Sequence, residues 1–181
     1  MRRSTSRINW RRISTPLPPE QPIFAMDENF PDPLVIEIAN RFTPELDLRP
    51  IRIIEPRLTG GIGDDRVILG LHQLRIEGLV TNDANMLFLP EVLSIIDQTG
   101  FTVVACESSG HDALVATGLL LTHLSRVARR HRPKTPQVWL LRAPDRGPER
   151  FEALRASAEA RTGLKVADFR LTRRQLQEPV A

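Results

Sequence analysis

Short apolar runs alternate with helix-like patterns along most of the chain, and this alternation constrains the fold more than any other feature. Five runs have the length and apolar character of buried strands, at residues 23–27, 51–55, 79–81, 101–106 and 136–141. Helical periodicity follows them, at about 32–42, 64–77, 89–99, 112–131 and 148–162. A repeated strand–helix unit gives a parallel sheet with helices on both faces. We therefore expect a three-layer α/β/α fold with a mostly parallel, five-stranded sheet.

Several residues mark where these elements begin and end. Asp32 and Pro33 suit the cap and the first position of the first helix. Gly78 and Gly100 suit the ends of the second and third helices. Beyond the last helix, the segment 165–171 is a candidate for a further short strand.

The composition indicates one globular, cytoplasmic domain. The chain has 181 residues, of which 41% are apolar and 26% charged, so it can bury a real core. No apolar run approaches the roughly 20 residues that cross a bilayer, and the basic N-terminus is not followed by the apolar segment of a secretory signal. The single cysteine, Cys106, excludes an internal disulfide and fits a reducing cytosol, where we expect it to pack inside a strand.

Charge is distributed unevenly along the chain. Residues 1–12 carry five arginines and no acid, residues 13–122 have a balance of −10, and residues 123–181 have a balance of +8. We expect a flexible basic arm at 1–20, a main domain at 21–142, and a basic helical extension at 143–181 that packs on the same domain. An acidic middle between basic ends suits a metal-dependent nuclease, although charged surface helices would give the same balance.

Acidic residues follow two of the predicted strands and begin one predicted helix. Asp27 ends the first strand, Asp83 follows the third, and Asp64 and Asp65 open the second helix. Ligands of open α/β sheets bind at the carboxyl ends of the strands. We therefore expect Asp27, Asp83 and one or both of the paired aspartates to converge around a divalent metal ion.

Helix phase distinguishes the two paired aspartates. Asp64 falls on the apolar stripe that contains Val67 and Ile68, whereas Asp65 is turned away from it by about 100°. An aspartate here could also cap the helix, but a cap needs only one. The preceding glycine-rich loop, 58–63, either cradles phosphate or sets the angle of the helix, and it lacks the lysine and hydroxyl residue of a P-loop.

The chemistry of these ligands predicts a hard ion. Every candidate ligand donates oxygen, which favours Mg²⁺ or Mn²⁺. Such ions activate a water molecule and stabilise the leaving oxygen in phosphodiester cleavage. Accessory roles at the site are expected for Glu28, Asn29, Asn82 and Asn85. Contacts with nucleic-acid phosphates are expected from Arg57, Arg126, Arg129 and Arg130.

The motifs resemble those of PIN-like domains. Met-Asp-Glu-Asn-Phe-Pro at 26–31, Gly-Asp-Asp-Arg-Val-Ile-Leu at 63–69 and Gly-Leu-Val-Thr-Asn-Asp at 78–83 are similar to the branch whose first strand ends in Asp-Glu-Asn. The resemblance implies a PIN-like domain over 21–142 that acts as a metal-dependent ribonuclease, in many members the toxin of a toxin–antitoxin pair. The partners it implies are an RNA substrate, an antitoxin protein and a second copy in a homodimer, with no membrane.

By this resemblance Asp27, Asp83 and one of the paired aspartates hold the metal. The family's spacing favours Asp65, whereas helix phase favours Asp64, so both stay candidates. The branch often has a further aspartate and a phenylalanine where this chain has Asn85 and Met86. For the fourth acid of the site, three glutamates compete: Glu28, Glu37 and Glu55.

Three other interpretations of the acids stay open. The first is a non-catalytic PIN-like scaffold that binds RNA or a protein, which the lack of a clear fourth acid favours. The second is a phosphoacceptor receiver domain, which would need a lysine after the fifth strand, where the chain has Arg142. In the third, every acid is a helix cap or a turn residue.

Overall fold

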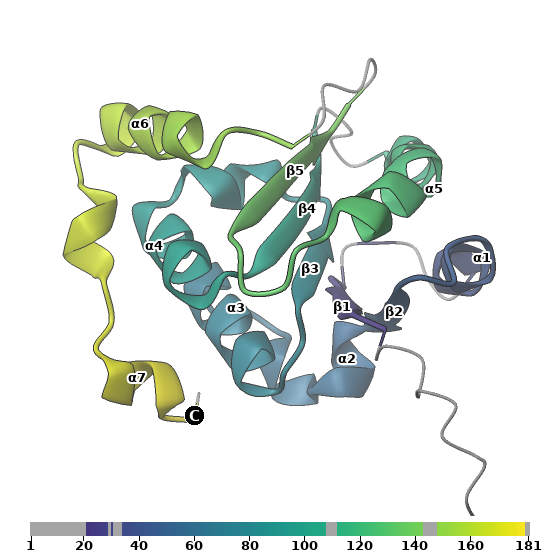
Figure 1. The fold of residues 1–181 in the computed structure, drawn as a ribbon, viewed down its shortest axis with the longest axis horizontal. Coiled ribbons are helices and arrows are strands. Elements are labelled where there is room, and N and C mark those ends of the chain that lie inside the picture. Colours follow the sequence, from purple (N-terminus) through teal and green to yellow (C-terminus); the bar gives the residue numbers. More distant parts are fainter. Residues whose placement is uncertain (1–20, 29, 31–33, 108–111, 143–147, 180–181) are drawn as a thin grey trace, which may run out of the picture.

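A single parallel sheet forms the centre of the molecule. The computed structural model describes residues 21–28, 30, 34–107, 112–142 and 148–179, so the predicted arm at 1–20 lies outside the described residues. The strands are β1 Ile23–Met26, β2 Asp47–Pro50, β3 Gly78–Thr81, β4 Thr102–Cys106 and β5 Gln137–Leu141. They pair in parallel in the order β2-β1-β3-β4-β5 (Figure 1). The predicted α/β class with a parallel, five-stranded sheet is confirmed.

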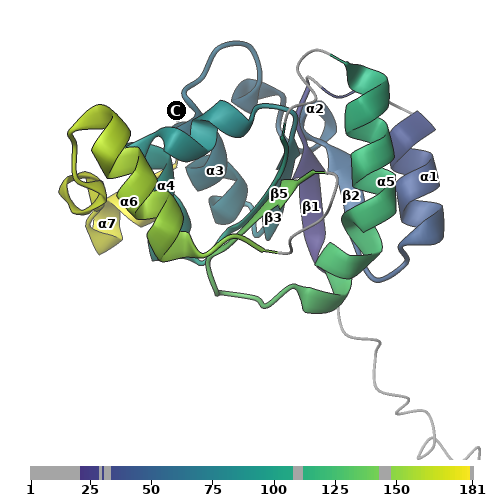
Figure 2. The ribbon, with the colours of Figure 1, turned by 90° about the horizontal axis from the view of Figure 1, so that it is seen from above.

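Helices connect the strands and cover both faces of the sheet. The α-helices are α1 Leu34–Phe42, α2 Ile51–Ile54, α3 Asp64–Gln73, α4 Pro90–Thr99, α5 Ala113–Arg130, α6 Phe151–Thr162 and α7 Arg173–Gln177. Three 3-10 turns join them, η1 Pro56–Leu58, η2 Ala84–Phe88 and η3 Val166–Phe169. α1 and α5 lie on one face, and α3, α4 and α6 lie on the other (Figure 2). None of the described helices is long and apolar enough to cross a membrane.

Alternate residues of β1, β3, β4 and β5 pack into two separate parts of the core. Phe24 and Met26 of β1 pack in the cluster that contains the apolar residues of α1 and α5. Ala25, between them, packs in the cluster formed with α3, α4 and α6. Because both faces of the sheet are covered, β1, β3, β4 and β5 are buried at almost every position, which explains their apolar runs in the sequence. The edge strand β2 is the exception, since only Leu48 of its four residues is buried.

The strand predicted at 51–55 is wrong. Ile51–Ile54 form the single helical turn α2, and the strand that pairs with β1 is Asp47–Pro50, immediately before it. β-branched residues favour strands when both sides of the pleated surface can be buried. Here Ile51 is buried but Ile53 is 73% exposed, so this segment is not buried on both sides as a central strand would be.

The helix predicted at 64–77 is too long. α3 ends at Gln73, because Arg75 takes a left-handed backbone conformation with φ 63°. Gly78, predicted to end this helix, is instead the first residue of β3. A Cβ atom on Gly78 would lie 2.6 Å from the ring atom Cε2 of Phe24. Glycine is therefore needed here so that β3 can pass close to the aromatic ring of β1.

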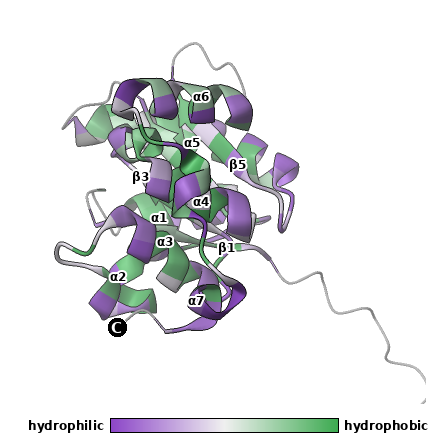
Figure 3. Cartoon of the chain, turned by 90° about the vertical axis from the view of Figure 1, so that its left-hand side faces the viewer, coloured by the Kyte–Doolittle hydropathy of each residue, from purple (hydrophilic) through white to green (hydrophobic). Residues whose placement is uncertain are grey.

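The strand predicted at 165–171 is also wrong. This segment contains the 3-10 turn η3, which lies against α4 rather than along the sheet. Leu154 of α6 and Val166 of η3 are buried in the same core cluster as α3 and α4. The Oε1 atom of Gln98 accepts a hydrogen bond of 2.9 Å from the backbone of Leu171. In Figure 3, α6 and α7 carry both hydrophobic and hydrophilic residues, as helices at the surface of a core do.

Cys106, the last residue of β4, packs in the core as predicted. The side chain is buried, and its Sγ atom lies 3.6 Å from the carbonyl oxygen of Ala116 in α5. Burial raises the pKa of this thiol to about 12. The thiolate is the reactive form of cysteine, so this side chain is a structural group.

Substituting Gly78 should destabilise the protein through the contact with Phe24. We expect Gly78→Ala to lower the free energy of unfolding by about 1–3 kcal/mol, because the added methyl group forces the ring or the strand to move. Gly118→Ala, in α5, is the matched control, since a Cβ there meets no atom within 4 Å and alanine favours helices. Urea unfolding of both variants measures the difference, and an equal effect at the two positions would contradict the prediction.

Candidate functional site

Three aspartates from different elements line one small pocket at the carboxyl edge of the sheet. Asp27 directly follows β1, Asp83 follows β3, and Asp64 is the first residue of α3. Their pocket has a volume of about 180 Å³. The chain crosses from β2 over β1 to β3, so the strand order reverses between β1 and β3, and the crevice at such a point is where α/β sheets bind ligands.

Thr81, the last residue of β3, joins two of these aspartates by hydrogen bonds. Its hydroxyl donates to Oδ2 of Asp27 at 2.9 Å and accepts from the backbone N–H of Asp83 at 3.0 Å. The backbone N–H of Asp27 donates to the carbonyl oxygen of Val80 at 2.9 Å, which continues the pairing of the two strands. Because Thr81 is only 1% exposed, these bonds fix the ends of β1 and β3 relative to each other.

The pKa of Asp64 is raised by its surroundings, which include the other carboxylates of the site. Burial is the largest cause that raises the pKa of Asp64 above its usual value, and the charges of Asp83 and Asp27 are the next causes. Asp65 and Glu91 raise it further. A carboxyl group whose pKa is raised by like charges is destabilised in its ionised form, and a bound cation would relieve that repulsion.

The paired aspartates of α3 face different cavities. Gly63 occupies the N-cap position, so Asp64 and Asp65 are the first two residues of the helix. Asp64 lines the pocket with Asp27 and Asp83, whereas Asp65 lines a neighbouring cavity together with Glu91. This arrangement corresponds to the difference in helix phase between them. Which of the two would bind a metal stays a prediction.

The donor set suits a hard cation, but its present arrangement does not form a closed cage. Asp27, Asp64 and Asp83 all offer oxygen atoms to the pocket, as Mg²⁺ and Mn²⁺ prefer. Across the described residues, no group of three or more His, Cys, Asp or Glu side chains is arranged to hold an ion. The aspartate side chains would therefore have to come closer together to share one cation. Without a cation, their mutual repulsion opposes this approach.

The predicted accessory residues are placed unequally. Glu28 lines the pocket, and its backbone N–H donates to Oδ1 of Asp27 at 2.7 Å. Asn85 is exposed, and its backbone N–H donates to Oδ1 of Asp83 at 2.8 Å. Asn82 lies half-buried between β3 and Asp83. Asn29 lies outside the described residues.

The predicted phosphate-binding arginines are not gathered at the pocket. Arg57 forms an ion pair of 2.9 Å with Glu55, beside the glycine-rich loop. Arg126, Arg129 and Arg130 lie in the last turns of α5, which runs from the carboxyl end of β4 to the start of β5. These three arginines are therefore near the opposite edge of the sheet.

The glutamates considered as the fourth acid differ in their positions, and two further acids near the edge were not anticipated. Glu37 is exposed on α1, and the pairing of Glu55 with Arg57 lowers the pKa of Glu55 to about 2. Glu91, in the first turn of α4, is close enough for its charge to raise the pKa of Asp64. Glu107 follows β4 and forms an ion pair of 2.8 Å with Arg142, which also pairs with Glu149.

Three residues of this edge were not anticipated, Thr81, Glu91 and Glu107, and the sequence contains a signal for two of them. Thr81 is the final buried residue of a strand that precedes Asp83, and Glu107 ends β4 as Asp27 ends β1. Glu91, in contrast, cannot be distinguished in the sequence from any other acid in the first turn of a helix. Only the packing of α4 beside α3 brings it near Asp64.

Comparison of the chain with protein-family models, with curated proteins and with solved structures found no match.

Removing the hydroxyl of Thr81 should destabilise the edge of the sheet. We expect Thr81→Val to lower the free energy of unfolding by about 1–3 kcal/mol, because the part-buried N–H of Asp83 loses its acceptor and Asp27 loses a donor. Thr81→Ser, which keeps the hydroxyl, should cost less. Urea unfolding measures both variants, and a valine variant as stable as the serine variant would contradict the role of these hydrogen bonds.

Replacing Asp64 should change how stability depends on pH. A carboxyl whose pKa is raised in the folded state costs stability once the pH exceeds its unfolded value of about 3.9, and the cost is complete above the folded pKa. We therefore expect the stability of Asp64→Asn, relative to wild type, to increase as the pH rises from about 3 to 7. Urea unfolding in EDTA at several pH values tests this, and a difference that is independent of pH would contradict it.

Proposed function

We propose that the protein is a metal-dependent endoribonuclease of the PIN-like type. The observation that carries the proposal is that Asp27, Asp64 and Asp83 line one pocket at the point where the strand order reverses. Burial and then the charges of Asp83 and Asp27 raise the pKa of Asp64, and this repulsion between carboxylates supports the proposal because a cation would relieve it. The resemblance of the motifs at 26–31, 63–69 and 78–83 to PIN-like domains supports the same conclusion.

In this proposal each residue of the pocket has a distinct task. Asp27 and Asp83 would hold Mg²⁺ or Mn²⁺, and Thr81 would orient Asp27 through its hydrogen bond to Oδ2. The ion, when bound, would make water a stronger nucleophile and stabilise charge on the phosphate. Asp64, which lines the same pocket, would accept a hydrogen bond from the attacking water at its own carboxylate oxygen.

The biological role and the partners follow from the resemblance. Many members of the Asp-Glu-Asn branch are toxins, so we propose that the chain acts in a toxin–antitoxin pair in the cytoplasm. The partners would be an RNA substrate, an antitoxin protein and a second copy of the chain. A pull-down from the native host in which no stable protein complex is recovered would argue against the antitoxin.

A non-catalytic PIN-like scaffold is the second candidate. The observation that favours it is the arrangement of the acids, since no three of them among the described residues are placed to hold an ion. A scaffold would use the same edge of the fold to bind RNA or protein without cleaving it. The two candidates differ in what the aspartates do, and this difference can be measured.

The experiment compares the wild type with Asp27→Asn and Asp83→Asn, each with and without Mn²⁺. For a nuclease, Mn²⁺ should raise the melting temperature of the wild type only. The bound ion should raise the free energy of unfolding by about 2.7 kcal/mol when Mn²⁺ is in hundredfold excess over its dissociation constant. Cleavage of a structured RNA should fall by about 100-fold or more in both variants, because a ligand of the ion is lost. Asp97→Asn, an aspartate of α4 outside the pocket, is the matched control and should behave as the wild type.

The outcomes separate the two candidates. If Mn²⁺ stabilises neither the wild type nor the variants and no RNA is cleaved, the nuclease proposal is wrong. RNA binding that persists in Asp27→Asn under those conditions would support the scaffold. Equal loss of cleavage in Asp97→Asn would show that the variants act through general destabilisation.

A further inference from the structure

A larger pocket lies at the amino edge of the sheet, away from the aspartates. It has a volume of about 650 Å³, within the range of small-molecule sites. It is lined by residues that precede β3, β4 and β5, among them His72, Arg75, Glu77, Phe101, His131 and Lys134. The four residues of β3 separate the two edges by about 13 Å, so this pocket is distinct from the proposed nuclease site.

Arg75 occupies a position of the pocket that ordinarily favours glycine. It follows the end of α3 with φ 63°, and its N–H donates to the carbonyl oxygen of His72 at 3.0 Å. The N–H of Ile76 donates to the carbonyl oxygen of Leu71 at 3.0 Å, which completes a Schellman motif. The left-handed residue of this motif is usually glycine, because a Cβ atom is strained there.

Lys134 occupies a second such position. The N–H of Thr135 donates to the carbonyl oxygen of Arg132 at 3.2 Å, so residues 132–135 form a β-turn with Pro133 in its second place. Lys134 is in the third place with φ 61°, as a type II turn requires, and glycine or asparagine is favoured there. A Cβ on Gly100 would lie 2.3 Å from the carbonyl carbon of Lys134, so the turn is packed tightly against the start of β4.

The coincidence of these two cations indicates a ligand. Arg75 and Lys134 are the two non-glycine residues with positive φ in the part of the chain that the structure describes, and both line the same pocket. At each position glycine would relieve backbone strain, so folding alone does not favour a cation. Strained backbone conformations concentrate at binding sites, where the side chain is needed.

The pocket also contains a fixed hydrogen-bonding group. The His131 side chain is 4% exposed, with Nε2 at 2.8 Å from Oε2 of Glu77 and Nδ1 at 3.1 Å from the hydroxyl of Thr102. The backbone of Glu77 is also held, because its N–H donates to Ile23 and its carbonyl oxygen accepts from Thr102. Glu77 thus presents a fixed carboxylate, and carboxylates at nucleotide sites accept hydrogen bonds from ribose hydroxyls.

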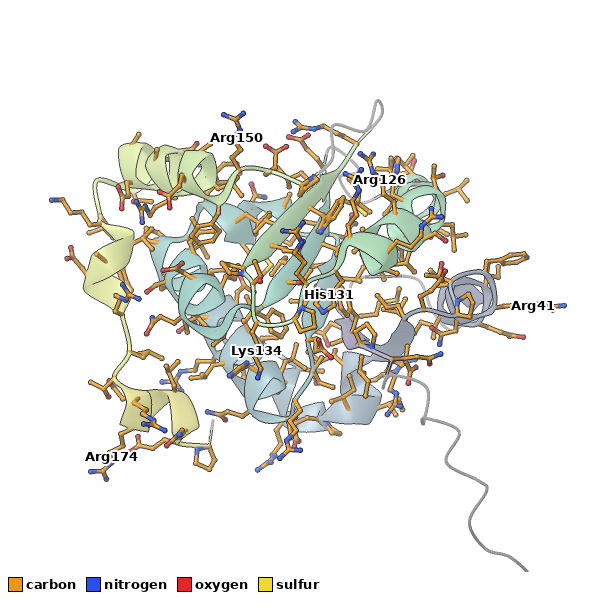
Figure 4. The ribbon with its side chains drawn as sticks, viewed as in Figure 1. Arg41, Arg126, His131, Lys134, Arg150 and Arg174 are labelled. Carbon is orange, nitrogen blue, oxygen red and sulfur yellow. The ribbon has the colours of Figure 1, made fainter. Side chains whose placement is uncertain are left out.

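We propose that this pocket binds a nucleoside monophosphate, with Arg75 and Lys134 holding the phosphate and Glu77 accepting from the ribose hydroxyls. The apolar residues Ile76, Phe101 and Pro133 in the lining offer contact for the base. Figure 4 shows Lys134 close to His131, whereas Arg126 and Arg41 lie farther out on α5 and α1. The proposal does not use the acidic pocket, so it stands or falls independently of the proposed nuclease activity.

The experiment measures binding of adenosine monophosphate, adenosine and inorganic phosphate to the full chain by titration calorimetry in EDTA. We expect the monophosphate to bind more tightly than either of the other two. Arg75→Gly and Lys134→Gly should each weaken its binding by about tenfold, the usual effect of losing a charge-assisted hydrogen bond. Lys134→Arg, which keeps the cation, should retain most of the affinity, and Arg174→Ala in α7 is the control for the loss of one charge.

Stability provides the second readout and separates ligand binding from a structural role. Both glycine variants should melt at or above the temperature of the wild type, because they relieve left-handed strain. Lys134→Asn, which also tolerates this backbone, should lose affinity in the same way. The proposal is overturned if the monophosphate does not bind the wild type at about 10 mM, or if neither glycine variant changes its affinity. Equal affinity for inorganic phosphate would overturn the assigned contacts with the nucleoside.

Discussion

The parallel pairing of β1 with both β2 and β3 is the constraint on which the rest of the structure depends. Because β1 lies inside the sheet, the chain must reverse its direction of travel across the sheet after β2, and the reversal opens a crevice at the carboxyl ends of β1 and β3. Asp27 and Asp83 are carried to this crevice by the strands themselves. The hydrogen bonds through Thr81 then hold the two strand ends together, so that the position of the acids is a property of the sheet rather than of a loop.

The aspartates and the two cations with positive φ lie at opposite edges of the sheet. The carboxyl edge collects aspartates, and burial together with their mutual repulsion raises the pKa of Asp64. The amino edge collects Arg75 and Lys134, held by the turns that enter β3 and β5. A parallel sheet makes this separation simple, because all its strands begin at one edge and end at the other. An acidic group that follows a strand and a basic group that precedes one are therefore kept apart by the length of the strand.

Much of the fold could be predicted from the sequence, because buried strands and the residues that follow them leave a local pattern. β3, β4 and β5 were predicted within a residue or two, since their apolar runs are bounded by glycine or proline. A strand was wrongly predicted at 51–55 because isoleucine favours strands whether or not a neighbouring strand is present. α3 was predicted too long because a left-handed Arg75 leaves no signal that distinguishes it from a helical arginine.

The candidate site was only partly predictable for a similar reason. Asp27 and Asp83 could be predicted to meet, because each follows a strand of the parallel sheet. Helix phase favoured Asp64 as the aspartate that faces them, with Asp65 kept as the alternative. The contribution of Glu91 could not, since it depends on how closely α4 packs beside α3. The ion pair of Glu107 with Arg142 also depends on the third dimension, because it joins the ends of two adjacent strands.

The burial of Cys106 has a practical consequence for later work on this molecule. The chain has a single cysteine, and its thiol is enclosed between β4 and α5 with little tendency to ionise. The native protein is therefore nearly inert toward alkylating probes while it is folded. A cysteine introduced at either edge of the sheet would be the one reactive thiol. A fluorophore or spin label could therefore be attached there without first replacing Cys106.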